Sequence, residues 1–223
     1  MITTPGDAAA SADGADRLEE ESYLVLRSRI DLSRLPRFSR DVTERVIHAS
    51  ADFDYATDLV CNEAALESAV VALADGAPVI VDAAMVAAGI PGCPVICKMD
   101  EPLTQRLSRT AGISMSAAAV RLAFGQVGPG AVWVVGCAPS ALQEILSRGV
   151  EPGFVVGMPV GFAGAAEVKD ALRASGLPSL SNVSEKGGAA VAAAAFNALL
   201  LWAMDFSGTR AGWGGATRPP AGR

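Results

Sequence analysis

The stretch Ala131-Val-Trp-Val-Val-Gly-Cys-Ala-Pro-Ser-Ala-Leu142 decides the fold class. It starts with a continuous apolar run, as expected for a strand buried on both faces of a parallel sheet. Glycine ends this run, and Pro139 opens a segment that reaches Arg148 with apolar residues at helical spacing. The stretch therefore predicts a strand, a tight turn and a helix.

Similar units occur on both sides of this stretch. Further short apolar runs, predicted to be strands, cover residues 78–81, 94–97, 154–156 and 180–183. Helical spacing is found over residues 16–30, 40–49 (with Ser39 as N-cap), 55–74, 114–124, 165–174 and 188–204. Strands that alternate with helices pair in parallel through right-handed crossovers. We therefore expect an α/β fold, a single-domain three-layer sandwich with a mainly parallel central sheet flanked by helices.

The ends of the chain differ in composition from the middle. Residues 1–14 are small and polar, and residues 207–223 are rich in glycine and proline. We expect a disordered leader over 1–14, one α/β domain over 15–206 and a flexible tail over 207–223.

Composition and charge exclude several classes of partner. The net charge of −6 leaves no basic stripe for nucleic acid, although it does not exclude an anionic small molecule. The longest apolar stretch, residues 189–204, is shorter than the ~20 residues of a spanning helix, so we expect a buried helix and no membrane contact. The N-terminus lacks the pattern of a signal peptide, which predicts a cytoplasmic protein. The four cysteines lack zinc-site spacing and are expected to be reduced thiols, so no metal site is predicted.

The loops that follow the predicted strands converge on one edge of the sheet. The glycines at 157, 161 and 164 do not have the G-x-G-x-x-G order, and no Walker loop is present, so the residues imply no nucleotide. Asp82 directly follows a strand, where an aspartate often caps the next helix. Glu167 and Lys169 open a helix, where we expect them to have a structural role.

His48 is the only histidine and the strongest candidate for acid–base chemistry. Its ordinary pKa lies near neutrality, so it can give or take a proton without a special environment. It also lies at the end of a predicted helix, from which a side chain can enter a crevice. On the residues alone, a structural histidine and a catalytic one both remain open.

Several segments together resemble the precorrin-8X methylmutase family. The most specific is Gly157-Met-Pro-Val-Gly-Phe-Ala-Gly-Ala-Ala-Glu-Val-Lys-Asp170. The others, in the order of the family, are residues 22–34, 46–49, 76–86, 136–142 and 187–199. Together they cover roughly residues 20 to 202.

The resemblance implies a homodimeric isomerase of cobalamin biosynthesis that uses no cofactor and acts on a corrinoid small molecule. Such an enzyme moves a methyl group between adjacent carbons of ring C, in precorrin-8X or in its cobalt form. His48 matches the catalytic histidine of the family, expected to act as general acid, and Ser22 matches a serine that contacts substrate. We expect the other substrate-binding residues to be Asp82, Met85, Ser114, Ser116, Gly136, Ala138, Gly157, Pro159, Gly161, Lys186, Gly187 and Gly188.

Three positions depart from the family's pattern. Met115, Glu185 and Glu21 stand where basic residues are common in the family. Arginine pairs well with the carboxylates that such a substrate carries, so these changes remove favourable charge. The alternative hypothesis is therefore a paralogue that binds a tetrapyrrole or corrinoid without turnover. A nucleotide-dependent enzyme is a third possibility, which only the general α/β pattern supports.

Overall fold

The computed structural model describes residues 5–208 of the chain, with side chains from residue 17 onward. Its sheet has six strands in the order β1-β6-β5-β4-β2-β3. All neighbours pair in parallel except β1, which runs antiparallel to β6. The strands are β1 (Leu59–Cys61), β2 (Val79–Val81), β3 (Val95–Cys97), β4 (Val132–Val135), β5 (Phe154–Gly157) and β6 (Ser179–Asn182).

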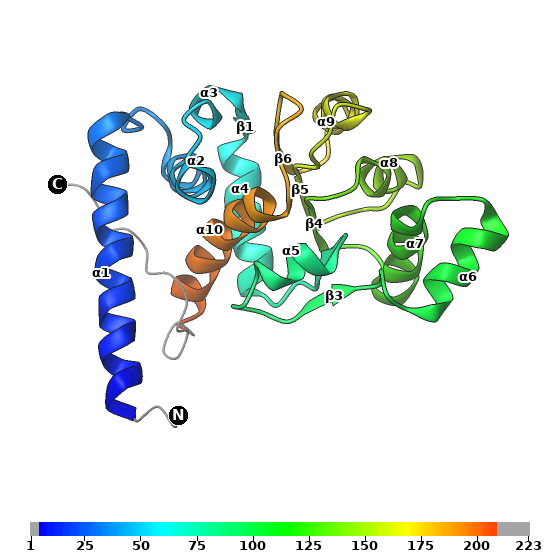
Figure 1. Cartoon of the computed structure of the whole chain (residues 1–223). Helices are drawn as coiled ribbons and strands as arrows, with labels where there is room; N and C mark the ends of the chain where they lie inside the picture. The colour runs from blue at the N-terminus through cyan, green and yellow to red at the C-terminus, as the bar shows by residue number, and fades with distance from the viewer. Residues whose placement is uncertain (1–4, 209–223) are drawn as a thin grey trace.

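Helices cover both faces of the sheet in the described part of the chain (Figure 1). They are α1 (Pro5–Arg29), α2 (Arg37–Ser50), α3 (Tyr55–Asp58), α4 (Glu63–Ala74), α5 (Ala84–Ala88), α6 (Pro102–Ala111), α7 (Met115–Val127), α8 (Pro139–Ser147), α9 (Ala165–Ala174) and α10 (Ala189–Ser207). Alternate side chains of a strand belong to two hydrophobic cores, one on each face of the sheet. In β2, Val79 and Val81 pack toward α2, α4, α5 and α10, while Ile80 packs toward α7 and α8. The three-layer α/β sandwich with a mainly parallel sheet is confirmed.

The sheet reverses its winding direction at β2. The chain runs from β2 to β3 on one side of β2 and then crosses back to place β4 on the other side. In open parallel sheets, a crevice opens at such a point beyond the carboxyl ends of the strands. Here the loops after β2 and β4 carry Asp82 and the segment Gly136–Ala138.

One prediction, a single helix over 55–74, is wrong. The segment contains the short helix α3, the strand β1 and the helix α4. Leu59 to Cys61 pair with Asn182 to Leu180 of β6, more than a hundred residues later in the chain. Asn62 then caps α4 by accepting a hydrogen bond from the Ala65 N–H at 3.1 Å. The apolar spacing alone did not reveal this because the partner strand is remote in sequence.

The first two helices begin earlier than predicted. α2 starts at Arg37 rather than Arg40, and Ser39 is not its N-cap. Instead, the Glu63 carboxylate from α4 accepts hydrogen bonds from the N–H groups of Phe38 and Ser39. α1 starts at Pro5 rather than Asp16, so helical backbone covers most of the predicted leader. Most of the predicted tail lies outside the described residues.

α10 forms the centre of the helical layer against α2 and α4. Among the described residues it is the one helix long and apolar enough to cross a membrane, and 67% of that apolar window is buried inside the protein. Its alanines allow close packing, since Ala192 and Ala193 approach the backbone of Gly136 and Gly89. This matches the expected buried helix. The sequence did not predict α5 and α6, which occupy the segments between predicted strands.

Candidate active site

His48 lies in the last turn of α2, on the side that faces α1. The neighbouring Val46 and Ile47 are buried in the core, which fixes the helix, whereas His48 stays half-buried. α2 ends at Ser50, and the positive φ of 54° at the C-cap residue Ala51 stops the helix three residues after the histidine. The imidazole is therefore held by a rigid element and remains reachable from solvent.

Two consecutive residues of α1 contact the imidazole. The Oγ of Ser22 lies 3.2 Å from the Nδ1 of His48. The ring of Tyr23 stacks on the imidazole, with centroids 4.4 Å apart and an interplanar angle of 10°. One contact sets the position of Nδ1 and the other sets the plane of the ring, so Nε2 is left for a ligand.

α1 is anchored by a charged pair on the same side. The Arg27 guanidinium donates to both oxygens of Glu44, at 2.6 and 2.9 Å. Because Glu44 precedes His48 by one helical turn, this pair fixes α1 directly beside the histidine. The packed side of α1 also carries Tyr23 and Leu26, which are both buried.

Tyr23 is fully buried, yet its hydroxyl has no hydrogen-bond partner among the residues that the structure describes. Burial raises the pKa of Tyr23 to about 12, so the phenol stays protonated under ordinary conditions. A buried, unpaired hydroxyl is uncommon in folded proteins. The ring's contact with His48 is therefore the clear structural contribution of Tyr23.

The environment lowers the pKa of His48 below its ordinary value. Burial is the largest cause, because it disfavours the charged imidazolium. The positive charge of Arg45 acts in the same direction, and Glu44 opposes it. The protonated ring is consequently a stronger acid than a free histidine.

A hollow of about 140 Å³ opens beside the imidazole. It is lined by Ser22, Val25, Leu26, Arg29, Ile47, His48, Ala51 and Phe53. Pockets for drug-sized ligands measure about 300–1,000 Å³. The hollow within this one chain therefore encloses only part of a larger ligand, next to one guanidinium.

Asp82, which follows β2, organises the loop that follows β4. Its carboxylate accepts hydrogen bonds from the N–H groups of Gly136, Cys137 and Ala138, at 2.8 to 3.0 Å. Burial raises its pKa, and the three N–H groups oppose that rise. The expected cap on the next helix is wrong: Asp82 holds the loop that leads into α8, and α5 begins at Ala84 with Ala83 as its N-cap.

Two glycines of these loops make room for helices. A Cβ on Gly136 would lie 2.9 Å from the Cβ of Ala192 in α10. A Cβ on Gly157 would lie 2.5 Å from a methyl group of Leu172 in α9. These two positions need glycine for packing, and their contact with a substrate stays a prediction.

The loop after β5 and the loop after β6 are joined backbone to backbone. The Gly161 N–H donates to the Glu185 carbonyl at 3.1 Å, and the Gly188 N–H donates to the Met158 carbonyl at 2.9 Å. Gly187, with φ 146°, presses against the Met158 carbonyl, where a Cβ would be only 2.3 Å away. The predicted residues Gly161, Gly187 and Gly188 therefore belong to two loops that hold each other, and Pro159 is buried in the first of these loops.

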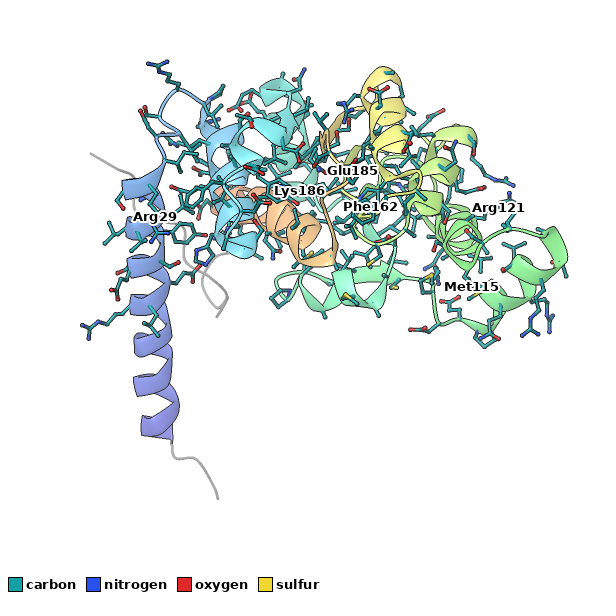
Figure 2. All side chains as sticks on the ribbon, turned by 45° about the horizontal axis from the view of Figure 1, so that its top comes forward. Arg29, Met115, Arg121, Phe162, Glu185 and Lys186 are labelled. Carbon is teal, nitrogen blue, oxygen red and sulfur yellow. The ribbon has the colours of Figure 1, made fainter. Side chains whose placement is uncertain are left out.

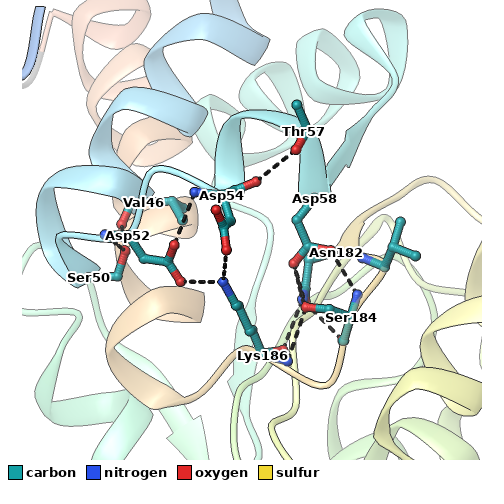
Figure 3. A network of polar contacts seen from close by, with 10 residues as sticks. Val46, Ser50, Asp52, Asp54, Thr57, Asp58, Asn182, Ser184 and Lys186 are labelled. Atoms are coloured by element: carbon teal, nitrogen blue, oxygen red, sulfur yellow. Dashed lines mark hydrogen bonds and ion pairs between the residues drawn. The ribbon is translucent and has the colours of Figure 1, made fainter. Parts of the chain in front are cut away.

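Lys186 connects these loops to the helix of His48. Its Nζ donates to Asp52 at 2.7 Å and to Asp54 at 2.6 Å (Figure 3). Both aspartates follow the end of α2 within six residues of His48. The two carboxylates raise the pKa of Lys186, and its charge is already neutralised without substrate. A substrate-binding role for Lys186 stays a prediction.

The remaining predicted residues lie elsewhere. Ser114 caps α7 by accepting the Ala117 N–H and bonds to the Ser140 hydroxyl at 3.0 Å. Figure 2 shows Met115, beside Ser114 and Ser116, near Arg121, while Arg29 is at the opposite end of the molecule and Phe162, Glu185 and Lys186 lie between. Met85 is exposed on α5. One chain does not bring Ser114 and Ser116 to His48.

Sequence reasoning missed three residues of the site. Tyr23 is next to Ser22 in the sequence, which puts it on the same helical turn. Arg29 lies two turns from Ser22 on α1, a spacing that places it on the same face. Lys169 lies near the start of a predicted helix, where a structural charge is expected, yet it is completely buried and bonds to the loop after β6. No sequence signal distinguishes a buried lysine from an exposed one.

The cysteines offer little reactivity. Burial raises the pKa of all four thiols, that of Cys61 to about 12. All four are free. Within the described residues, no three His, Cys, Asp or Glu side chains come together as metal ligands do.

The fold is that of a three-layer α/β protein, and its candidate site is built around the single imidazole of the chain. Within that class of α/β proteins, the chain belongs to the precorrin-8X methylmutase family, whose family model matches residues 17–202. The family's members are isomerases of cobalamin biosynthesis. The expected family membership and the isomerase class are thus confirmed.

Individual relatives agree with this assignment. The chain is 35% identical to the cobalt-precorrin-8 methylmutase of Methanocaldococcus jannaschii, over 88% of this chain and 98% of that protein. It is 38% identical to a precorrin-8X methylmutase of Sinorhizobium sp, over 81% and 91%. The solved structure of a precorrin-8X methylmutase from Thermus thermophilus superimposes with a TM-score of 0.77 at 31% identity, over 86% of this chain and 97% of that one.

Proposed function

We propose that this protein shifts a methyl group between adjacent ring C carbons of precorrin-8X, or of its cobalt form, with His48 as general acid. The observation that carries this proposal is the clamp on the sole imidazole, held at Nδ1 by Ser22 and across its face by Tyr23. A clamped imidazole with a free Nε2 suits proton transfer to a rigid, conjugated ligand.

The proposed step is an isomerisation and balances without an oxidant or a reductant. Protonated His48 gives its Nε2 proton to the macrocycle, which makes the conjugated ring electron-poor. The bond from the methyl carbon to the first ring carbon breaks as the bond to the adjacent carbon forms, and the methyl group carries its electron pair. Loss of a ring proton to His48 restores the acid. During the step, the Nδ1–H of the imidazolium donates to Ser22.

We propose that a second copy of the chain completes the pocket. The hollow beside His48 is too small to enclose a macrocycle, while Phe162, which is 97% exposed, lies on the glycine-rich loop. Arg29 lines the hollow, and its guanidinium can pair with a substrate carboxylate that enters it. The predicted substrate-binding loops of the second copy supply the remaining contacts with the macrocycle. We place the reaction in the cytoplasm, in keeping with four free thiols.

The test is anaerobic incubation of the protein with precorrin-8X and, in a parallel arm, with cobalt-precorrin-8. Absorption spectroscopy follows formation of the corrin product. We expect turnover, and a loss of about 10²–10⁴-fold in kcat for His48→Ala. Added imidazole should restore part of that activity, because the variant leaves room beside the hollow. Tight binding of the substrate with no change in its absorption spectrum would contradict the proposal.

That last outcome is the signature of the second candidate function, binding of a corrinoid without turnover. Met115, Glu21 and Glu185 favour it, because the family commonly carries basic residues at these positions. Size-exclusion chromatography with light scattering tests the dimer separately, with a monomer at micromolar concentration counting against it.

A further inference from the structure

Lys169 is a completely buried lysine in the second turn of α9. Its Nζ donates hydrogen bonds to the Asn182 side-chain oxygen at 3.0 Å and to the Lys186 carbonyl at 2.8 Å. A third bond goes to the Ser184 carbonyl. An ammonium has three N–H groups, so all of its donors are used.

All three of these acceptors are neutral. The charged groups that face Lys169 act from farther away: Asp58 from α3, Arg173 from its own helix and Glu185 from the loop. Burying an ammonium without a bonded carboxylate costs stability, which an apolar side chain of similar length avoids. Stability alone therefore gives no reason for a lysine at this position.

The bonds of Lys169 end on the segment that forms the floor of the predicted site. The Ser184 and Lys186 carbonyls flank Glu185, whose own carbonyl accepts the Gly161 N–H. Two residues after Lys186, the Gly188 N–H donates to the Met158 carbonyl. Asp58 holds the start of the same segment through the N–H groups of Val183 and Ser184 (Figure 3). Lys169 fixes the middle of the segment from within the protein together with Asn182, whose buried side-chain amide donates to the same Ser184 and Lys186 carbonyls at 3.2 and 2.9 Å.

We propose that Lys169 is a positioning residue that locks the 184–188 segment against the Met158–Gly161 loop and so shapes the substrate-binding floor. It touches no reacting atom in this arrangement and acts through the backbone of the two loops. The kinetic part of this inference rests on the proposed function, whereas the structural part does not.

The lock depends on the proton of Lys169. Burial lowers the pKa of this lysine to about 8; Arg173 adds to the effect, and Asp58 and Glu185 oppose it. A neutral amine has two N–H groups for three acceptors, so one bond is lost when the proton leaves. The floor is consequently locked below pH 8 and loosened above it.

Amide hydrogen exchange of the free protein tests the lock without any substrate. Lys169→Met should speed exchange at Gly161 and Gly188 by about tenfold, since each amide depends on the locked segment. Arg173→Met is the matched control: Arg173 lies one turn along α9 and bonds to Ser181 and Asn182, not to the 184–188 carbonyls. It should leave both amides unchanged. Equal exchange in the wild type and Lys169→Met overturns the proposal.

A pH series on the wild type serves if Lys169→Met does not fold. After correction for intrinsic exchange, protection of Gly161 and Gly188 should fall above pH 8, while amides in the strands of the sheet keep theirs. Protection that is constant from pH 6 to 10 contradicts the lock.

Kinetics supply the second readout. In the wild type, kcat/KM should fall with slope −1 as His48 loses its proton, and it should show an additional decrease of up to about tenfold near pH 8, when Lys169 loses its own. The pH profile of Lys169→Met should lack the additional decrease in kcat/KM near pH 8 and keep the decrease due to His48. At lower pH, the KM of this variant should be about tenfold higher than that of the wild type, with kcat changed far less. If the wild type shows no turnover, the proposed function is wrong, and the hydrogen-exchange result still tests the structural part of this inference. A turning-over wild type with an unchanged Lys169→Met profile defeats this inference.

Discussion

The ring of Tyr23 lies flat on the imidazole of His48, with centroids 4.4 Å apart and planes within 10°. The two residues are 25 positions apart in the chain and sit on the facing sides of α1 and α2. An aromatic face attracts a cation, so this contact favours the protonated ring while it fixes its plane. The acid of the proposed reaction is thus oriented by a residue whose phenol keeps its proton, with a pKa raised to about 12 by burial.

Tyr23 variants separate the stack from the hydroxyl. Tyr23→Phe keeps the ring and removes a buried oxygen without a partner, so we expect unchanged kcat and stability raised by about 1 kcal/mol. Tyr23→Leu removes the stack, and kcat should fall by about tenfold. Thermal unfolding and steady-state rates measure both. A large loss of kcat in Tyr23→Phe would show that the hydroxyl acts in the reaction.

Ser22→Ala removes the partner of Nδ1. Hydrogen bonds to charged groups contribute about 1.5–3 kcal/mol, which corresponds to a fall in kcat of roughly 10- to 100-fold. The unfolding midpoint should stay the same, because Ser22 is exposed. Ser22→Thr keeps the hydroxyl and is the control. Equal rates in Ser22→Ala and the wild type would remove Ser22 from the mechanism.

The pH dependence follows from the charges around His48. Its pKa is lowered by burial and by Arg45, and the acid must be protonated, so kcat/KM falls as pH rises through that pKa. Arg45→Gln removes the repelling charge; the pKa should rise, and the fall in activity should move to higher pH. Arg45→Lys keeps the charge and should leave the pKa in place. NMR reads this pKa directly because the chain has one histidine, and a pKa that drops in Arg45→Gln contradicts the assignment.

The same lowered pKa affects folding. Between the folded pKa and the ordinary value near 6.5, the unfolded chain binds more protons at His48 than the folded chain. Stability from this residue is therefore present at high pH and declines as pH falls through that window. Denaturant unfolding at pH 5 and pH 7 should show a smaller pH difference in His48→Gln than in the wild type. A difference of the same size assigns the effect to other groups.

Phe162 offers a test of the substrate surface. It is 97% exposed on the glycine-rich loop, so it contributes little to the folded chain. Phe162→Ala should leave stability within about 0.5 kcal/mol and raise KM several-fold, because a flat macrocycle loses an aromatic contact. Phe206→Ala, at an exposed phenylalanine of α10, is the matched control. An unchanged KM in Phe162→Ala excludes this residue from the binding surface.

The sequence by itself determined the layers and the acid. Apolar runs such as Val132 to Val135, each followed by a helical segment, specify parallel strands because only a doubly covered sheet buries both faces. Residues 157–170 carried the family resemblance, and the uniqueness of His48 made it the candidate acid. These features are local, so they can be read along the chain.

Tertiary structure alone decided what surrounds that acid. β1 exists because Leu59 to Cys61 pair with β6, and α2 begins early because Glu63 caps it from another helix. Tyr23 meets His48, and Lys169 reaches the carbonyls of 184 and 186, only after packing brings remote segments together. Such contacts depend on the relative placement of elements, which residue spacing within one element does not encode. The sequence thus indicated the candidate proton donor, and the fold supplied the contacts of Ser22 and Tyr23 that hold its ring.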